Sequence, residues 1–188
     1  MKRLIVIEGY DRSGKDTLMQ DLEDIKVLLP NTYIYFNDLE GLPKYDKEQE
    51  NFLDWLNRLI SKQISELNKL FEEYDNIIMT RLIVSDEVYS KLFNREHTTI
   101  KYIDKLNSEV KIINYCLLFN SFKEYLNRLF IIDKNLEPQY NLPDFMYINE
   151  LYKNEILKYK GSRIYYIFSN TSRLEILKDF INHVYKKQ

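Results

Sequence analysis

Ten residues near the N-terminus have the types and the spacing needed to hold phosphate groups. They read EGYDRSGKDT from Glu8 to Thr17, and they include Gly9 and Gly14, two of the four glycines in the chain. Glycine lets a backbone turn tightly and direct its N–H groups at phosphate oxygens, and a following helix N-terminus adds positive partial charge there. Lys15 can then reach the β- and γ-phosphates of a nucleotide. The segment is therefore a candidate phosphate-binding loop (P-loop).

The flanking segments have the patterns of the strand and the helix that such a loop requires. The apolar run 4–7 precedes the loop. A stripe at helical spacing follows it, made of Leu18, Leu22, Ile25 and Leu29. Strand, glycine loop, lysine and helix in this order favour a genuine P-loop over a chance match in a surface turn.

The rest of the chain alternates between short apolar runs and helical patterns. Buried strands are predicted at 3–7, 33–36, 76–80, 110–118 and 163–168. Further helices are predicted at 52–71, 121–130, 145–159 and 172–185, the last with a capping box formed by Ser172 and Glu175. This alternation predicts one α/β domain over residues 1–188, with the three-layer architecture of P-loop NTPases and a five-stranded parallel sheet flanked by helices. The irregular segment 131–143, with two prolines, suits a lid over the phosphate site.

Composition narrows the possible partners and compartment. The formal net charge is −2 and the sequence pI is about 5.8, so we expect no stable nucleic-acid complex and no attraction to an anionic membrane. No run approaches the ~20 apolar residues of a membrane span. Cys116 is the single cysteine, which indicates a reducing compartment. We therefore expect a cytoplasmic protein. The abundance of Asn, Lys, Ile and Tyr indicates an A/T-rich source genome, that of a virus or of an A/T-rich bacterium, and for a viral gene the compartment would be the host cytoplasm.

A single-domain P-loop protein of 188 residues with a candidate lid favours phosphoryl transfer from ATP, with Mg²⁺, to a small acceptor. The base-reading Asn-Lys-x-Asp motif of GTPases is absent from the sequence. Transfer of this kind depends on positioning and on neutralising the charge of the phosphoryl group.

Two motifs resemble those of thymidylate kinases. The first, Glu8 to Thr17, follows the pattern E-G-x-D-x-x-G-K-x-T. In the second, Arg81 follows a strand, with Ser85 four residues and Tyr89 eight residues further on. The resemblance covers the layout of the whole chain, but its motifs cover only 4–20 and 77–90. It implies a deoxynucleoside monophosphate as acceptor, with conversion of dTMP to dTDP as the first expectation, and a homodimer as in many relatives.

The resemblance, together with the chemistry of the side chains, indicates roles for individual residues. The residues expected to bind ATP are Gly9, Ser13, Gly14, Lys15, Asp16, Thr17 and Arg128, and those expected to be catalytic are Arg12, Lys15 and Arg81. The residues expected to contact the acceptor are Asp11, Phe52, Trp55, Arg58, Arg81, Ser85 and Tyr89. Arg12 places the chain with relatives that carry an arginine in the P-loop, since the lid segment offers only Lys134.

Several of these roles have structural alternatives. Asp11, which resembles the family residue that contacts the 3′-hydroxyl of the acceptor, is also a common turn-forming residue. Arg81 suits bidentate binding of a phosphate but also a structural ion pair, and Arg12 could be a solvated surface arginine. Phe52 and Trp55 lie on an apolar stripe, so core packing is the favoured alternative there. Arg128 could hold phosphates or complement a helix C-terminus.

Two departures from the family pattern concern the metal. Asp16 stands directly after the lysine, where a P-loop normally has Ser or Thr as a ligand to Mg²⁺. Thr80 stands before Arg81, where thymidylate kinases have Asp. We hypothesise that the two positions have exchanged roles, so that Asp16, Thr17 and Thr80 are the candidate metal ligands, because oxygen ligands of either kind suit Mg²⁺.

A third departure concerns the acceptor. Relatives carry an arginine after the second strand that grips the acceptor phosphate, whereas here Lys44 is the nearest cation. Asp38 or Glu40 could instead act as a general base on a 5′-hydroxyl, which makes a deoxynucleoside kinase the main alternative. A kinase acting on a nucleotide within DNA is less favoured because of the acidic pI, and a non-catalytic P-loop module is the alternative from another class.

Overall fold

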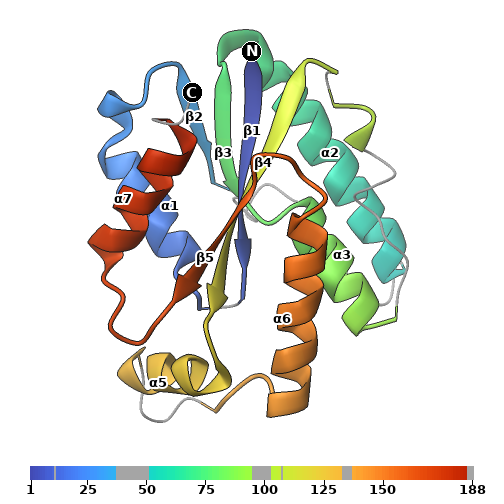
Figure 1. The fold of residues 1–188 in the computed structure, drawn as a ribbon. Coiled ribbons are helices and arrows are strands. Elements are labelled where there is room, and N and C mark those ends of the chain that lie inside the picture. Colours follow the sequence, from blue (N-terminus) through green and yellow to red (C-terminus); the bar gives the residue numbers. More distant parts are fainter. Residues whose placement is uncertain (11, 37–50, 95–102, 107, 133–136, 186–188) are drawn as a thin grey trace.

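The computed structural model describes all residues except 11, 37–50, 95–102, 107, 133–136 and 186–188. In the described part of the chain, five parallel strands form one sheet in the order β2-β3-β1-β4-β5 (Figure 1). The strands are β1 (Lys2–Gly9), β2 (Thr32–Tyr35), β3 (Asn76–Thr80), β4 (Val110–Phe119) and β5 (Arg163–Ile167). The predicted fold class, with all five of its strands, is confirmed.

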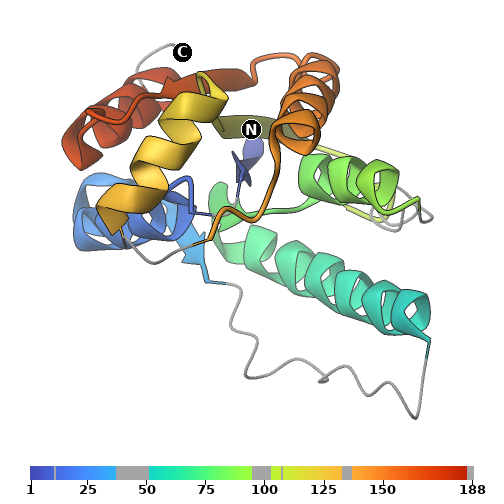
Figure 2. The same ribbon diagram turned by 90° about the horizontal axis from the view of Figure 1, so that it is seen from below.

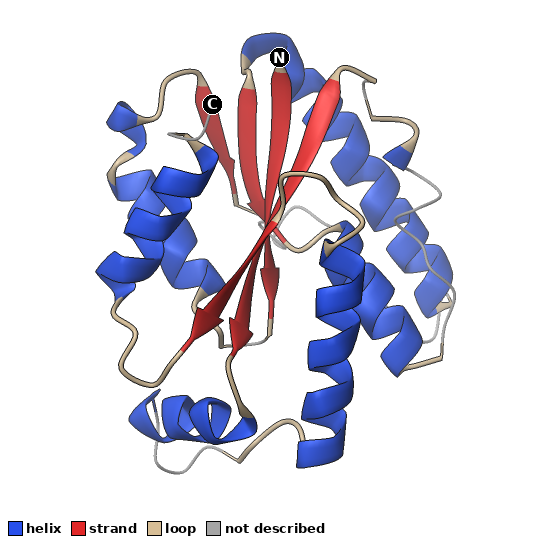
Figure 3. Cartoon of the chain, viewed as in Figure 1, coloured by secondary structure: helices blue, strands red, loops and turns tan. Residues whose placement is uncertain are grey.

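Helices cover both faces of this sheet (Figures 1 and 3). They are α1 (Lys15–Asp24), the short 3-10 helix η1 (Lys26–Leu28), α2 (Phe52–Glu73), α3 (Ile83–Leu92), α5 (Phe122–Ile132), α6 (Leu142–Ile156) and α7 (Arg173–Val184). The central strand β1 packs against both layers: Leu4 and Val6 belong to the core on the α2 side, whereas Ile5 and Ile7 belong to the core formed with α1 and α7. A strand buried on both faces explains the continuous apolar run in its sequence.

The sequence did not predict α3. Almost the whole helix is buried, including Ser85, Asp86 and Glu87 along with its apolar residues. A helix that is covered on most sides lacks the alternation of apolar and polar residues that reveals an amphipathic helix. The periodicity was therefore uninformative in this segment.

The candidate lid is shorter than the predicted 131–143. Helix α5 continues through Ile132, and α6 already begins at Leu142, three residues before the predicted start. Asn141 caps α6, because its side chain accepts a hydrogen bond from the backbone N–H of Asp144 at 2.9 Å. At the other end of the chain, the capping box of Ser172 and Glu175 is present as predicted.

The carboxyl ends of the strands form the edge at which ligands bind in parallel α/β sheets. Figure 1 shows the loop between β1 and α1 at this edge, with α5 lying beyond the ends of β4 and β5, and Figure 2 views the same edge from below. Among the described residues, no helix has both the length and the apolar character to cross a membrane.

Candidate nucleotide-binding site

The backbone of the P-loop has the conformation that its glycines allow. Gly9 ends β1 with a φ of 130°, and a Cβ at this position would lie 2.1 Å from the carbonyl oxygen of Leu117 on β4. Gly14 is the N-cap of α1 with a φ of 93°, and Arg12 has a φ of 63°. Asp11 lies outside the described residues. The loop therefore turns directly into the N-terminus of α1, where backbone N–H groups favour anions.

Lys15 is folded onto the loop that carries it. Its ammonium group donates hydrogen bonds to the carbonyl oxygens of Gly9, at 3.1 Å, and of Tyr10. The residue is only 4% exposed. Burial lowers the pKa of this ammonium to about 8, against the opposing effect of the Asp16 and Glu8 carboxylates.

A pocket of about 490 Å³ opens next to Lys15. Its lining residues are Arg12, Gly14, Lys15, Asp16, Thr17, Arg81, Arg128 and Ile132. Among them, three guanidinium groups and one ammonium group face one carboxylate. The pocket thus brings together the three residues predicted to be catalytic, and its charge favours a polyanion.

The two arginines from outside the loop reach the pocket from different elements. Arg81 follows β3 with a φ of 51°, and its backbone N–H donates to the carbonyl of Ile7 at 3.0 Å, which places it beside the P-loop strand. Arg128 belongs to α5, and its guanidinium lies 3.5 Å from the carbonyl oxygen of Thr171. Parallel pairing of β1 with β3 and with β4 explains why residues so distant in sequence reach the same pocket.

Solved structures with a similar architecture include two kinases and a protein bound to a nucleotide. The thymidylate kinase of Candida albicans aligns with 98% of the chain and 92% of its own, at a TM-score of 0.62 and 18% identity. A deoxyadenosine kinase from M. mycoides, with dCMP and dCDP bound, aligns over 97% and 99% at a TM-score of 0.54 and 18% identity. The YorR protein of Bacillus subtilis, in complex with phosphorylated GDP, aligns over 95% and 93% at a TM-score of 0.51 and 22% identity.

The chain has the fold of the P-loop nucleotide and nucleoside kinases. No family model matches the sequence, and no curated protein matches it either. At these identities, the kinase fold is established by the arrangement of the backbone, and the chemistry has to be argued from the site.

The candidate metal ligands do not all line the pocket of this kinase fold. Asp16 and Thr17 do, and both are exposed in the first turn of α1. Thr80 is half-buried at the end of β3 and is not one of the lining residues. Among the described residues, no group of three or more His, Cys, Asp or Glu side chains could hold a metal. A carboxylate and a hydroxyl beside a phosphate pocket do fit Mg²⁺, which keeps several waters and binds substrate phosphates.

Ser13 is a further loop residue whose environment suits a ligand. It is only 1% exposed, and its hydroxyl oxygen has no hydrogen-bond partner among the described residues. A buried polar atom of this kind usually has a partner, which a bound phosphate could supply.

Ser85 and Tyr89, predicted to contact the acceptor, are held by other side chains. The Ser85 hydroxyl is buried, donates to the carboxylate of Glu8 and lies 3.2 Å from the Tyr152 hydroxyl. The Tyr89 hydroxyl lies 3.2 Å from that of Tyr140, a residue of the candidate lid. Neither residue lines the 490 Å³ pocket.

The aromatic residues at the start of α2 are not part of the buried core. Phe52 is 39% exposed and its ring lies 5.5 Å from that of Trp55, while Arg58 is exposed in the next turn. The buried face of α2 begins at Leu59. The favoured alternative of core packing is therefore wrong for Phe52. Contact of these three residues with an acceptor stays a prediction.

Sequence reasoning missed the structural role of Glu8. Its carboxylate is fully buried and accepts hydrogen bonds from the backbone N–H groups of Leu82, Val84 and Ser85 at 3.1–3.2 Å. Burial raises the pKa of Glu8, while these hydrogen bonds oppose the shift. An acidic residue at the end of an apolar strand was the available signal. Glu8 anchors the start of α3 to the P-loop strand.

Sequence reasoning also missed Tyr10 and a second hollow beside Arg12. The Tyr10 ring is fully buried and stacks on Phe145 with 5.2 Å between centroids, and its hydroxyl donates to the Phe145 carbonyl at 2.7 Å. Tyr10, the variable third residue of the E-G-x-D motif, therefore connects the P-loop to α6.

The second hollow has a volume of about 370 Å³. It is lined by Arg12, Tyr125, Leu129, Glu137 and Gln139.

Proposed function

We propose that the protein is a nucleoside monophosphate kinase of the thymidylate-kinase type. It transfers the γ-phosphoryl group of ATP, with Mg²⁺, to a deoxynucleoside monophosphate, and conversion of dTMP to dTDP is the first candidate reaction. One observation carries the proposal: the 490 Å³ pocket joins Lys15 of the P-loop to arginines from three separate places in the chain. Such an excess of positive charge matches two phosphorylated substrates better than one.

Each residue of the pocket has a role in phosphoryl transfer that follows from its position. The N-terminus of α1 and Lys15 hold the β- and γ-phosphates of ATP. Arg12 neutralises charge on the transferred phosphoryl group, and Arg81 grips the acceptor phosphate with its planar guanidinium. Arg128 holds ATP from the α5 side. Asp16 and Thr17 would hold Mg²⁺, which when bound neutralises charge on the phosphate oxygens.

A deoxynucleoside kinase is the second candidate. It is favoured by the lack of an arginine between β2 and α2, and by structural likeness to a deoxyadenosine kinase over 97% of the chain. Its base would be Asp38 or Glu40, which lie outside the described residues, as does Lys44. The presence of Arg81 in the ATP pocket favours the monophosphate instead. A nucleotide in DNA is a less favoured acceptor at a pI of about 5.8.

The deciding experiment offers two acceptor panels to the purified protein with ATP and Mg²⁺. One panel holds dTMP, dUMP and the other deoxynucleoside monophosphates, and the other holds thymidine and the other deoxynucleosides. We expect transfer to a monophosphate and a raised KM for it in Arg81→Gln. Transfer to nucleosides alone would establish the second candidate. ATP binding without transfer on either panel would support a DNA acceptor or a non-catalytic module.

We further propose that the enzyme works in the cytoplasm and is a homodimer, as thymidylate kinases commonly are. Both statements rest on the sequence and on the resemblance. The mass in solution, measured by light scattering, tests the second.

A further inference from the structure

The carbonyl oxygen of Gly9 is held by two donors from different parts of the molecule. The Lys15 ammonium lies 3.1 Å away and the Tyr152 hydroxyl lies 3.2 Å away. Tyr152 belongs to α6 and is separated from Gly9 by 143 positions. A carbonyl oxygen has two lone pairs, so these two hydrogen bonds use its full capacity.

Tyr152 is well placed to remain a donor when the site changes. The residue is fully buried, its ring lies 5.9 Å from that of Tyr10, and its oxygen lies 3.2 Å from that of Ser85. Burial raises the pKa of its hydroxyl well above the ordinary value, so the group keeps its proton. The proton of Ser85 goes to Glu8, which leaves the Tyr152 proton for Gly9.

The hydrogen bond from Lys15 to Gly9, in contrast, is expected to break when a nucleotide binds. The proposed function requires its ammonium to turn from the loop carbonyls to the phosphates of ATP. Gly9 is buried, and a buried carbonyl that loses every partner costs free energy. This free-energy cost would therefore oppose the movement of Lys15 unless a second donor keeps its hydrogen bond to the Gly9 carbonyl.

We propose that Tyr152 is this second donor and acts as a positioning residue for nucleotide binding. It keeps the Gly9 carbonyl paired after Lys15 has moved to the phosphates, and so lowers the cost of releasing the lysine. The inference rests on the proposed function only in assuming that the P-loop binds a nucleotide. It assigns to α6, the helix that follows the candidate lid, a direct part in preparing the loop.

The test compares Tyr152→Phe with wild type and with Tyr115→Phe. Tyr115 is a matched control because it is also fully buried and its hydroxyl also donates a hydrogen bond, to Asp179 at 2.8 Å. This hydrogen bond joins β4 to α7 and does not involve the P-loop. We expect Tyr152→Phe to bind a non-hydrolysable ATP analogue about tenfold more weakly, because the Gly9 carbonyl is left unpaired. The KM for ATP should rise, while kcat and the KM of the acceptor stay constant. Tyr115→Phe should lose a similar amount of thermal stability and keep the affinity of wild type.

A second measurement reports on the carbonyl itself. Gly9-Tyr10 is the single Gly-Tyr pair in the sequence, so ¹³C-carbonyl glycine combined with ¹⁵N tyrosine gives one NMR signal for this peptide group. In wild type we expect the Gly9 carbonyl to remain in its hydrogen-bonded range when the ATP analogue binds. In Tyr152→Phe it should move upfield.

The outcomes separate the inference from the function on which it rests. Equal ATP affinity in Tyr152→Phe and wild type, or an equal loss in both tyrosine variants, would overturn the role of Tyr152. The same conclusion would follow if the Gly9 signal of the variant did not respond to nucleotide. Failure of wild type to bind any nucleotide would instead overturn the proposed function.

Discussion

The Lys15 ammonium is almost completely buried, so the proposed binding of a nucleotide should depend on pH. Its pKa is lowered to about 8, whereas binding to phosphate requires the protonated form. Affinity for ATP should be constant well below pH 8 and fall by up to about tenfold per pH unit above it, with uptake of a proton on binding. Calorimetry in buffers of different ionisation enthalpy measures this uptake. Lys15→Arg should bind independently of pH over the same range, because arginine does not titrate there. No proton uptake between pH 8 and 9 would contradict the assignment.

Asp16 is the residue on which the metal hypothesis depends. It lines the 490 Å³ pocket at the position where a P-loop normally supplies a hydroxyl. We expect Asp16→Ala to lower kcat/KM by at least about 100-fold, since Mg²⁺ would lose a ligand. Asp16→Ser alone should not restore a normal enzyme, because Thr80 stands where relatives have the carboxylate. Steady-state kinetics over a Mg²⁺ titration test both variants. A fully active Asp16→Ala would contradict the hypothesis that Asp16 is a ligand to Mg²⁺.

The contact of the P-loop strand β1 with β4 depends on Gly9. A Cβ there would lie 2.1 Å from the Leu117 carbonyl oxygen, which is backbone and cannot easily move. We expect Gly9→Ala to destabilise the fold by more than about 4 kcal/mol. Gly161→Ala is the matched control: its φ is also positive, at 88°, but the nearest atom to the new Cβ is 3.6 Å away. Gly161→Ala should lower the free energy of unfolding by about 1–2 kcal/mol. Equal losses in urea unfolding would show that backbone strain, and not the close approach, explains the glycine.

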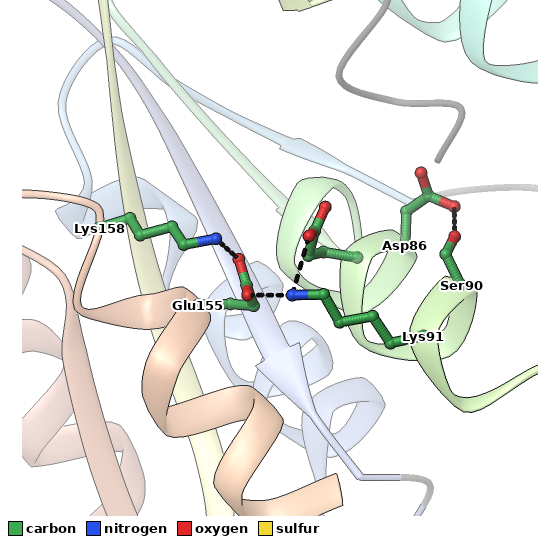
Figure 4. A network of polar contacts seen from close by, with 6 residues as sticks. Asp86, Ser90, Lys91, Glu155 and Lys158 are labelled. Carbon is green, nitrogen blue, oxygen red and sulfur yellow. Dashed lines mark hydrogen bonds and ion pairs between the residues drawn. The ribbon is translucent and has the colours of Figure 1, made fainter. Parts of the chain in front are cut away.

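Helices α3 and α6 are joined by a charged network, shown in Figure 4. The Lys91 ammonium lies 2.7 Å from Glu155 and 3.1 Å from Glu87, and Lys158 also pairs with Glu155. Burial raises the pKa of Glu155, but hydrogen bonds from Lys158 and Lys91 outweigh it, so the net pKa is lowered. The stability from this carboxylate is therefore present above its unfolded pKa, near 4.5, and is lost as the pH falls through the lower folded value.

Glu155→Gln tests this network. The variant should be less stable by about 1–2 kcal/mol at pH 7, because the exposed lysines can return to water. Its stability should also decline less steeply than that of wild type in acid. Glu23→Gln, which removes an exposed pair with Lys26, should change the free energy of unfolding by less than about 0.5 kcal/mol. Parallel acid curves for wild type and Glu155→Gln would rule out the predicted contribution.

The C-terminal helix α7 contacts strands β1 and β4. The Arg3 guanidinium donates to the Val184 carbonyl at 3.0 Å, and the fully buried Phe180 meets Tyr115 edge-on with 5.0 Å between ring centroids. We expect Phe180→Ala to cost about 3–5 kcal/mol, whereas Leu174→Ala, at a position that is 55% exposed on the same helix, should be almost neutral. Denaturant unfolding measures both. A small loss for Phe180→Ala would mean that α7 contributes little to the stability of the whole.

The parts of this protein that were predictable from sequence are those whose causes are local. The five strands, the P-loop and the capping box of Ser172 and Glu175 each depend on residues within a few positions of one another. Apolar runs, glycine at positive φ and side chains that cap a helix act over such distances. Even the approach of Arg81 to the P-loop was expected, because the carboxyl ends of parallel strands share one edge.

The tertiary structure alone decided how distant segments support that loop. The buried helix α3, the anchoring of its start by Glu8, and the hydrogen bond from Tyr152 to Gly9 join positions that are 74 or more apart. It also placed Ser85 against Glu8, and Phe52 outside the core. Contacts of this kind depend on strand order and on which helices pack together. They leave no periodic signal in the sequence, because burial from several sides replaces the alternation of apolar and polar residues.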